Sequence, residues 1–219
     1  RQWQYHSVTV LELDTPHGPA RAHLHGGDEP RAALILGHGA AGGVEAPDLV
    51  AARDAALSER ITVALIEQPY RVAGRRSPAR APQLDAAGCF GLEHLRASEW
   101  AGLRLITGGR SMGARVACRT VEESNAVAVL CLAFPLEPPR RAGKPPQSRL
   151  PELDAVTVPT LVVQGERDRF GMPPPRPARE VTKVPGDHNL KAALEAVAAA
   201  VRGWLARVVA EAAPTRHFV

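Results

Sequence analysis

The chain has 219 residues, of which 45% are hydrophobic and 23% charged, so the sequence excludes a disordered tail and predicts one folded domain spanning residues 1–219. No apolar run approaches the roughly 18 residues of a membrane span, so we expect no membrane partner. The formal net charge is +4, but aromatic residues make up only 4% and do not interleave with the arginines, so nucleic-acid binding is not expected either.

The N-terminal third predicts edge strands followed by a buried strand. Residues 8–13 and 20–25 alternate between polar and apolar side chains around a Pro- and Gly-containing turn, which indicates an antiparallel hairpin at a sheet edge. Residues 32–36 form a continuous apolar run, typical of a strand buried on both faces. This strand leads into the glycine-rich loop 37–43.

The rest of the chain alternates between helical and extended patterns. We expect helices over residues 47–59, 84–99, 114–123 and 190–213, and strands over residues 61–66, 103–107, 126–134, 160–164 and 181–184. Alternating strands and helices imply an α/β fold, with a mostly parallel sheet and helices on both faces. The Pro-rich segments 68–82 and 135–150 are expected as loops, and no insertion is long enough for a large lid.

The segment 108–114 has the pattern of a nucleophile elbow. Ser111 lies between Gly109 and Gly113, after a predicted strand and before a predicted helix. In this setting a tight turn pushes the serine hydroxyl out of the sheet edge, and flanking side chains would collide with the turn. Ser111 is therefore the candidate nucleophile.

A serine nucleophile needs a general base, and the base needs an orienting acid. Asp168 follows the predicted strand 160–164, and His188 follows the next strand. The order Ser, Asp, His is that of the α/β-hydrolase arrangement, and all three positions fall at the carboxyl edge of the sheet. We therefore expect Ser111, His188 and Asp168 to form a catalytic triad.

Other residues compete for these roles. Glu137, after the strand that precedes residue 160, is the rival acid, and an ordinary turn role is the alternative for Asp168. Asp187 is adjacent to His188 in sequence, which makes it a poor orienting partner. The remaining histidines lie in the hairpin, in the tails or in a helix, apart from His38 in the glycine-rich loop.

The glycine-rich loop is expected to supply part of an oxyanion hole. One donor would be the backbone N–H of Met112, and the second that of Ala40, with Ala41 as the alternative. Gly39 would let the backbone approach a substrate oxygen. The alternative interpretation of this loop is an ordinary glycine turn without a catalytic role. For His38 a hydrogen bond that staples the loop is favoured over catalysis.

The three cysteines, Cys89, Cys118 and Cys131, are odd in number and lack metal-ligand spacing. We expect the three cysteines to be free, buried thiols in a reducing cytoplasm. We expect no metal or other cofactor. No signal peptide is visible in the sequence, which begins at Arg1 and not at methionine. The sequence leaves the oligomeric state open.

At these motifs the sequence resembles a known family. The segments 37–40, 109–113, 164–171 and 186–188 are similar to the α/β-hydrolase branch that contains testis-expressed protein 30 and the third subunit of the non-specific-lethal complex. The resemblance covers roughly residues 30–210. Dienelactone hydrolase is a more distant relative by this resemblance, with a cysteine nucleophile where this chain has Ser111. Some members of the branch resemble scaffold subunits, so the resemblance implies the fold and the triad more than a reaction.

Two functions remain at this point. The first is a serine hydrolase, carboxylesterase-like, that acts on an ester, thioester or related acyl compound. The second is a binding or scaffold module that has kept the pocket without significant turnover. The intact set of Ser111, Asp168 and His188 favours the enzyme. Without a lid, we expect a shallow cleft that suits small soluble esters.

Basic residues crowd the loops expected around the site, and neither residues 68–82 nor residues 138–150 contain an acid. The candidate rim consists of Arg71, Arg110, Arg140 and Arg141, with further basic residues at Arg75, Arg76, Arg80, Lys144, Arg149, Arg167 and Arg169. A rim of one sign concentrates anionic substrates, and arginine binds carboxylate or phosphate bidentately. The hypothesis is an acyl substrate with a negative group; a genomic arginine bias on solvated loops is the alternative.

Overall fold

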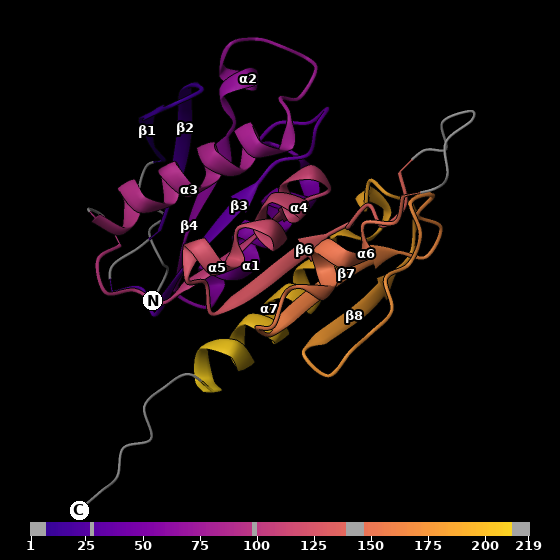
Figure 1. Ribbon diagram of the computed structural model, residues 1–219. Helices are drawn as coiled ribbons and strands as arrows, with labels where there is room; N and C mark the ends of the chain where they lie inside the picture. Colours follow the sequence, from indigo (N-terminus) through magenta and orange to yellow (C-terminus); the bar gives the residue numbers. More distant parts are fainter. Residues whose placement is uncertain (1–7, 27–28, 98–99, 139–146, 212–219) are drawn as a thin grey trace, which may run out of the picture.

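In a computed structural model, residues 8–26, 29–97, 100–138 and 147–211 of the 219-residue chain are described. Within these residues the strands form one eight-stranded sheet of order β1-β2-β4-β3-β5-β6-β7-β8 (Figure 1). The strands are β1 Thr9–Thr15, β2 Gly18–His25, β3 Ala32–Gly37, β4 Ile61–Glu67, β5 Leu105–Arg110, β6 Ala128–Leu132, β7 Thr160–Gly165 and β8 Arg179–Val184. The pairs β1–β2 and β2–β4 are antiparallel and the other pairs are parallel, which confirms the predicted edge hairpin and α/β fold.

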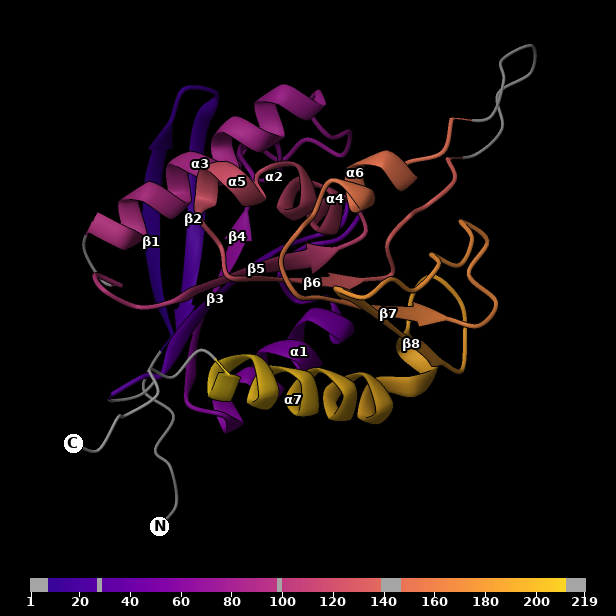
Figure 2. The ribbon, with the colours of Figure 1, turned by 60° about the horizontal axis from the view of Figure 1, so that its bottom comes forward.

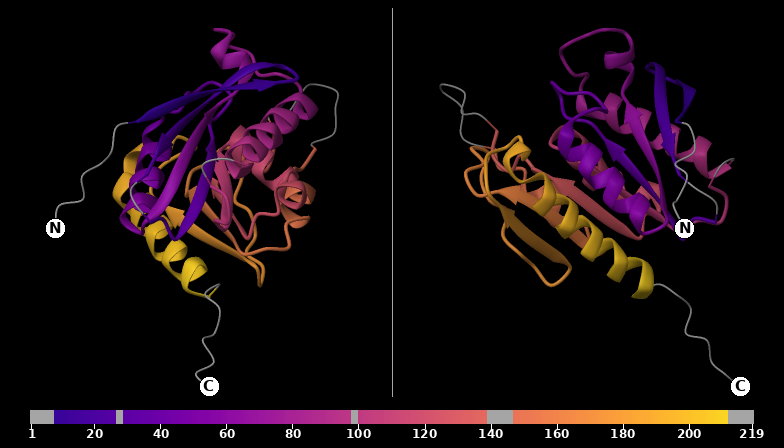
Figure 3. Two further views of the ribbon diagram at one scale, coloured as in Figure 1. Left: turned by 90° about the vertical axis from the view of Figure 1, so that its left-hand side faces the viewer. Right: turned by 180° about the vertical axis from the view of Figure 1, so that it is seen from behind.

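Helices cover both faces of this sheet, as Figure 2 shows. The helices are α1 Pro47–Ser58, α2 Pro69–Val72, α3 Ala81–Ala97, α4 Met112–Arg119, α5 Val121–Ser124, α6 Leu150–Asp154 and α7 Leu194–Glu211, with a 3-10 turn at Lys191–Ala193. Helices α1 and α7 lie side by side on one face, as the view from behind in Figure 3 also shows. Helices α3 to α6 lie on the other face.

The two layers follow from the period of two along each buried strand. On β3, Leu34 and Leu36 pack with α1 and α7, whereas Ala33 and Ile35 pack with α3 and α4. The apolar spacing of the last helix predicts a buried stripe of Leu194, Val197, Val201, Leu205 and Val208; the last four are buried, whereas Leu194 is only partly buried. Sheet burial on both faces holds β3 and β5 rigidly at the centre, and this rigidity positions the segments that follow them.

Several boundaries differ from the sequence prediction. The helix expected over 114–123 begins at Met112 and breaks at Thr120, whose backbone departs from helical geometry and whose hydroxyl bonds the Val116 carbonyl. The last helix does not begin at Leu190, because Leu190 is left-handed with φ 54°. Helices α2 and α6 lie within segments expected as loops. In the described part of the chain, no helix is long and apolar enough to cross a membrane.

Candidate active site

Ser111 occupies a strained turn between β5 and α4. Its backbone has φ 52° and ψ −104°, a combination that residues with a side chain rarely adopt. The Ser111 N–H donates to the Leu132 carbonyl oxygen at 2.9 Å, and the Ser111 carbonyl accepts from the Arg115 N–H at 3.2 Å. The turn is thus held from the neighbouring strand and from the helix, and such strain persists only where the surroundings enforce it.

The glycines beside Ser111 are required by backbone contacts. A Cβ atom at Gly109 would lie 2.5 Å from the carbonyl oxygen of Gly37. A Cβ atom at Gly113 would collide with the same oxygen and with the rest of the Gly37 backbone. The end of β3 therefore packs backbone to backbone against the elbow, and this contact explains both glycines of the Gly-x-Ser-x-Gly pattern.

His188 lies between Ser111 and Asp168. Its Nε2 atom is 3.0 Å from the Ser111 Oγ, and its Nδ1 atom is 2.8 Å from the Asp168 Oδ2. A carboxylate only accepts hydrogen bonds, so the Nδ1–H donates to Asp168, and Nε2 is left to accept the serine hydroxyl. The structure therefore brings the three predicted residues into one hydrogen-bonded line.

Asp168 is held on both oxygens. Its side chain is fully buried; Oδ2 also accepts from the Gln164 amide at 2.9 Å, and Oδ1 accepts from the Phe170 N–H at 2.9 Å. The Phe170 ring packs edge-on against His188, with ring centroids 4.5 Å apart. The carboxylate is thereby fixed in direction, and one side of the imidazole is shielded.

The two residues proposed as oxyanion donors lie at the ends of two neighbouring segments. Met112 is the first residue of α4, and Ala40 follows β3 in the glycine-rich loop. Within the described chain, neither N–H donates to a protein acceptor. The Tyr70 hydroxyl donates to the Ala40 carbonyl oxygen at 2.9 Å and so fixes the plane of that peptide.

His38 staples the glycine-rich loop, as the sequence predicts. Its Nε2 atom accepts from the Gln68 N–H at 3.1 Å, which leaves the Nδ1–H to donate to the Gly39 carbonyl at 2.8 Å. Burial lowers the pKa of His38, and the charge of Arg71 lowers it further, against the Gly39 hydrogen bond that raises it. A neutral imidazole with this tautomer ties the loop to the end of β4.

The rival acids lie elsewhere. Glu137 is exposed, and its backbone N–H donates to the Phe170 carbonyl, without any contact from its carboxylate to His188 among the described residues. Asp187 accepts the N–H of Asn189 at 3.0 Å and so shapes the turn that carries His188.

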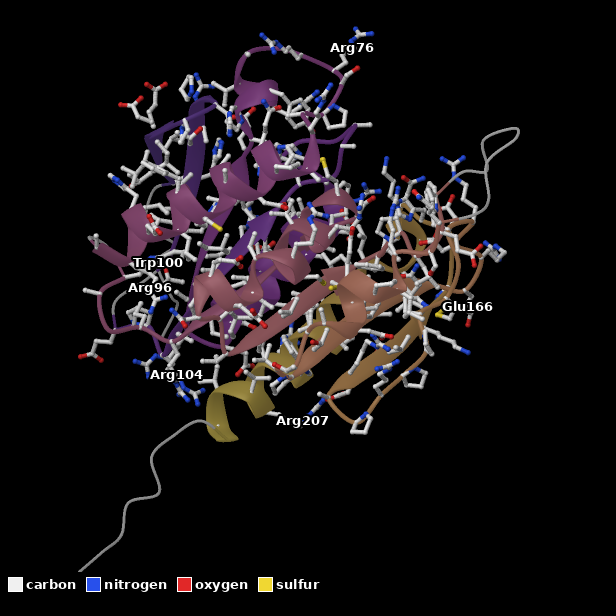
Figure 4. The ribbon with its side chains drawn as sticks, viewed as in Figure 1. Arg76, Arg96, Trp100, Arg104, Glu166 and Arg207 are labelled. Atoms are coloured by element: carbon white, nitrogen blue, oxygen red, sulfur yellow. The ribbon has the colours of Figure 1, made fainter. Side chains whose placement is uncertain are left out.

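The arginines expected at the rim have different settings. Arg71 is partly buried, and its Nε has no hydrogen-bond partner in the described structure. Arg110 is bound inside the protein, since its Nε–H donates to the buried Asp48 at 2.8 Å and only 13% of its side chain is exposed. Arg140 and Arg141 lie outside the described residues. In Figure 4, Arg76 lies at the top of the view, at the outer end of the segment after α2, whereas Arg96 and Arg104 lie at the lower left.

In the part of the chain that the structure describes, two hollows lie near the candidate site. One is small and mainly apolar, and it lies behind Met112 between the sheet and helices α3 and α4. The other is larger and more polar, lies under the segment 68–82, and is lined by Tyr70, Arg75 and Gln83 among others. Neither is lined by Ser111 or His188, and the first reaches the residues beside the elbow, Met112 and Gly113.

The sequence interpretation missed Tyr70, Asp48, Gln164 and Phe170 as parts of this site. Gln164 and Phe170 flank Asp168 closely in sequence, and that proximity could have suggested their contacts. Tyr70 and Asp48 lie 30 and 62 residues from their partners Ala40 and Arg110, and no local pattern signals such contacts.

Comparison with known proteins agrees with this arrangement. Residues 30–200 match the family described as "Alpha/beta hydrolase domain". No curated protein matches the chain. A solved α/β serine hydrolase without lid, XC6422 from Xanthomonas campestris, is similar at TM-score 0.74 and 18% identity, over 94% of this chain and 97% of that one.

Two further solved structures have the same fold. Est1E from Butyrivibrio proteoclasticus matches with TM-score 0.72 and 16% identity, over 93% of this chain and 100% of that one. Dienelactone hydrolase from Anabaena variabilis matches with TM-score 0.73 and 15% identity, over 94% of this chain and 99% of that one.

Proposed function

The chain belongs to the alpha/beta hydrolase domain family, and from that premise we propose that it is a serine hydrolase that cleaves an ester, thioester or related acyl bond. The observation that carries the proposal is the line of hydrogen bonds from Ser111 through His188 to Asp168, on a strained elbow. The structural neighbours include proteins named as serine hydrolase, esterase and dienelactone hydrolase, which supports hydrolysis in general.

In the proposed reaction, Ser111 Oγ attacks the acyl carbon while His188 Nε2 takes the hydroxyl proton. The Met112 and Ala40 N–H groups bind the oxygen that becomes negative, and losing one such donor typically costs about 10²–10³ in rate. His188 then returns the proton to the leaving group, and an acyl-enzyme remains on Ser111. Water, deprotonated by the same histidine, releases the acid. Asp168 holds the imidazole in the required tautomer throughout.

The carboxylesterase-like class is the finer part of the proposal. The absence of a long insertion favours small soluble esters, and XC6422, which is described as lidless, has the same overall fold. We also propose that the chain belongs to the branch of testis-expressed protein 30, because of the motifs in its sequence. A cytoplasmic location is proposed from the three cysteines, which are free thiols.

The anionic group of the substrate is proposed from the basic rim. Arg71 supports this part most directly, because its guanidinium lacks an acidic partner among the described residues and its charge reaches both His38 and Tyr70. Arg75 and Arg76 lie exposed on the same segment. A carboxylate or phosphate on the substrate would complement this surface.

A fluorophosphonate probe tests the proposal, because it reacts with an activated serine whatever the natural substrate is. We expect the wild-type protein to be labelled at Ser111, and Ser111→Ala to abolish the labelling. Folded wild-type protein that stays unlabelled would instead favour the non-catalytic binding module.

A further inference from the structure

Arg110 joins three segments that carry parts of the candidate site. Its Nε–H donates to the Asp48 Oδ2 at 2.8 Å. Its Nη2 donates to the carbonyl oxygen of His188 at 3.3 Å and to the Asn189 Oδ1 at 3.2 Å. One guanidinium therefore connects the start of α1 with the turn that carries the candidate base.

The anchor of this connection is Asp48. Its side chain has no exposed surface, and its Oδ1 accepts the Leu49 N–H at 3.0 Å. Burial raises the pKa of Asp48, whereas the facing Arg110 lowers it. A buried carboxylate needs such a partner, so Asp48 and Arg110 hold each other in place.

The same guanidinium also lies against the glycine-rich loop. A Cβ atom at Gly39 would come within 2.6 Å of the Arg110 Nη1. Gly39 precedes Ala40, the proposed oxyanion donor. The turn that carries His188 and the loop that carries Ala40 therefore lie against the two terminal nitrogens of the Arg110 side chain, Nη2 and Nη1.

We propose that Arg110 is a positioning residue, which, anchored on Asp48, holds the backbone of His188 so that the imidazole stays in line with Ser111. The inference rests on the proposed serine hydrolase function. Asp168 fixes the rotation of the imidazole, but it does not bind the backbone of the turn. That turn follows the edge strand β8, and its start is held by the Arg167 N–H, which donates to the Gly186 carbonyl at 2.9 Å. Arg110 holds the same turn two residues later, at the carbonyl of His188 itself.

Arginine suits this role better than lysine. Its planar fork donates in several fixed directions, whereas the lysine ammonium is a single point on a flexible stem. A lysine at position 110 would keep a charge for Asp48 and lose the simultaneous bond to His188. The low exposure of Arg110, whose Nε–H and Nη2 donate within the protein, also argues against direct contact with substrate.

Two variants separate positioning from folding. Arg110→Lys keeps the buried carboxylate paired. The double variant Asp48→Asn/Arg110→Met removes both charges, so that no unpaired buried charge is left to unfold the protein. A matched control is Asp154→Asn/Arg179→Met, which removes the buried Arg179 and its partly exposed partner Asp154 at the amino end of β8, at the edge of the sheet away from Ser111.

The first readout is the second-order rate of fluorophosphonate labelling, corrected for the folded fraction measured in urea. We expect a fall of about 10²-fold in the double variant, as for a catalytic group displaced by about 1 Å, and a smaller fall in Arg110→Lys. The control should retain the wild-type labelling rate, whatever its stability.

The second readout is the downfield proton resonance of the His188 Nδ1–H, assigned by its loss in His188→Gln. We expect it to broaden or vanish in both Arg110 variants and to persist in the control. This measurement reports the imidazole even in a protein that the probe does not label, so it separates failure of the hydrolase proposal from failure of this one. Folded Arg110 variants with an unchanged resonance would overturn the positioning role. If the wild type is labelled, Arg110 variants that are labelled at the same rate would overturn it as well.

Discussion

The hydroxyl of Tyr70 donates to the carbonyl oxygen of Ala40 at 2.9 Å, in the loop whose N–H is proposed to bind the oxyanion. The Tyr70 ring also packs against His38, with centroids 5.8 Å apart, so two side chains support the same loop. The Ala40 carbonyl shares a peptide plane with the N–H of Ala41, the alternative donor, so the tyrosine restrains that N–H directly and the Ala40 N–H through the shape of the loop.

Tyr70→Phe should therefore slow acyl hydrolysis without preventing folding. We expect a loss of about tenfold, less than the 10²–10³ that follows loss of a donor itself. The kcat for a p-nitrophenyl ester is the measurement. An unchanged kcat would show that the loop keeps its shape without the hydroxyl.

The pH dependence of stability gives a second test of Tyr70. Burial raises the pKa of Tyr70 to about 12, although Arg71 lowers it. The neutral form is favoured in the folded state, so this stabilisation is complete below pH 10 and is lost as the pH rises towards 12. The free energy of unfolding of the wild type should fall across that window more steeply than that of Tyr70→Phe. Parallel curves would contradict the assignment.

Asp168→Asn should cut the hydrolysis rate severely, by about 10⁴-fold in the serine-protease precedent, because an amide favours the wrong imidazole tautomer. Glu137→Gln is the control and should change little, since the Glu137 side chain is exposed. Rates of a soluble ester decide between the two carboxylates. Reversed outcomes would reassign the orienting acid.

The strain at Ser111 predicts a gain in stability when function is removed. Glycine tolerates positive φ, so the free energy of unfolding of Ser111→Gly should be about 1 kcal/mol higher than that of Ser111→Ala. This difference is the one that remains after the larger backbone entropy of unfolded glycine has been subtracted. Both variants should be unlabelled. Urea denaturation measures the difference, and equal stabilities would mean that the turn relaxes.

Gly113→Ala should destabilise the fold strongly, because the new methyl group would collide with the backbone of Gly37. Gly203→Ala is the helical counterpart: Gly203 lies exposed in α7, and its nearest contact would be the Arg207 side chain at 4.0 Å. This control should be stabilised by about 0.5–1 kcal/mol, the usual gain for alanine in a helix. Thermal unfolding of both variants tests the contrast.

The anionic-substrate proposal predicts a salt effect. A carboxylate-bearing ester should be hydrolysed faster than a neutral ester of the same size at low salt, and the preference should fade at high salt. Arg71→Gln should reduce the preference. Equal rates for both esters at both salt concentrations would leave arginine bias on solvated loops as the explanation.

Local patterns in the sequence predicted the elements that carry Ser111, Asp168 and His188. Each follows an apolar strand of recognisable period, and parallel strands place their carboxyl ends at one edge, so three separate positions converge without any knowledge of contacts. The break of the helix at Thr120 and the left-handed Leu190 escaped prediction, because single backbone angles set them and those angles depend on packing.

The supporting contacts could not be predicted for a related reason. Arg110 was expected at the solvent-facing rim because it lies beside Ser111 in a basic sequence. Its partner Asp48 belongs to a helix 62 residues earlier, and only the closed fold brings the two together. Side chains that act through long-range pairs carry no periodic signature, so charge counting did not reveal that Arg110 is paired with the buried Asp48.

The candidate nucleophile and its base lie in parts of the sheet that differ in local stability. Ser111 follows the central strand β5, whereas His188 follows β8, the last strand of the sheet. Edge elements open more often than central ones, because fewer neighbours must be separated. On warming, the chemistry should therefore fail by fraying at β8 while the central strands remain paired, and such inactivation would reverse on cooling. Heat tolerance of the activity is then a property of the outermost strand, and reinforcing β8 would extend it more than any improvement of the core.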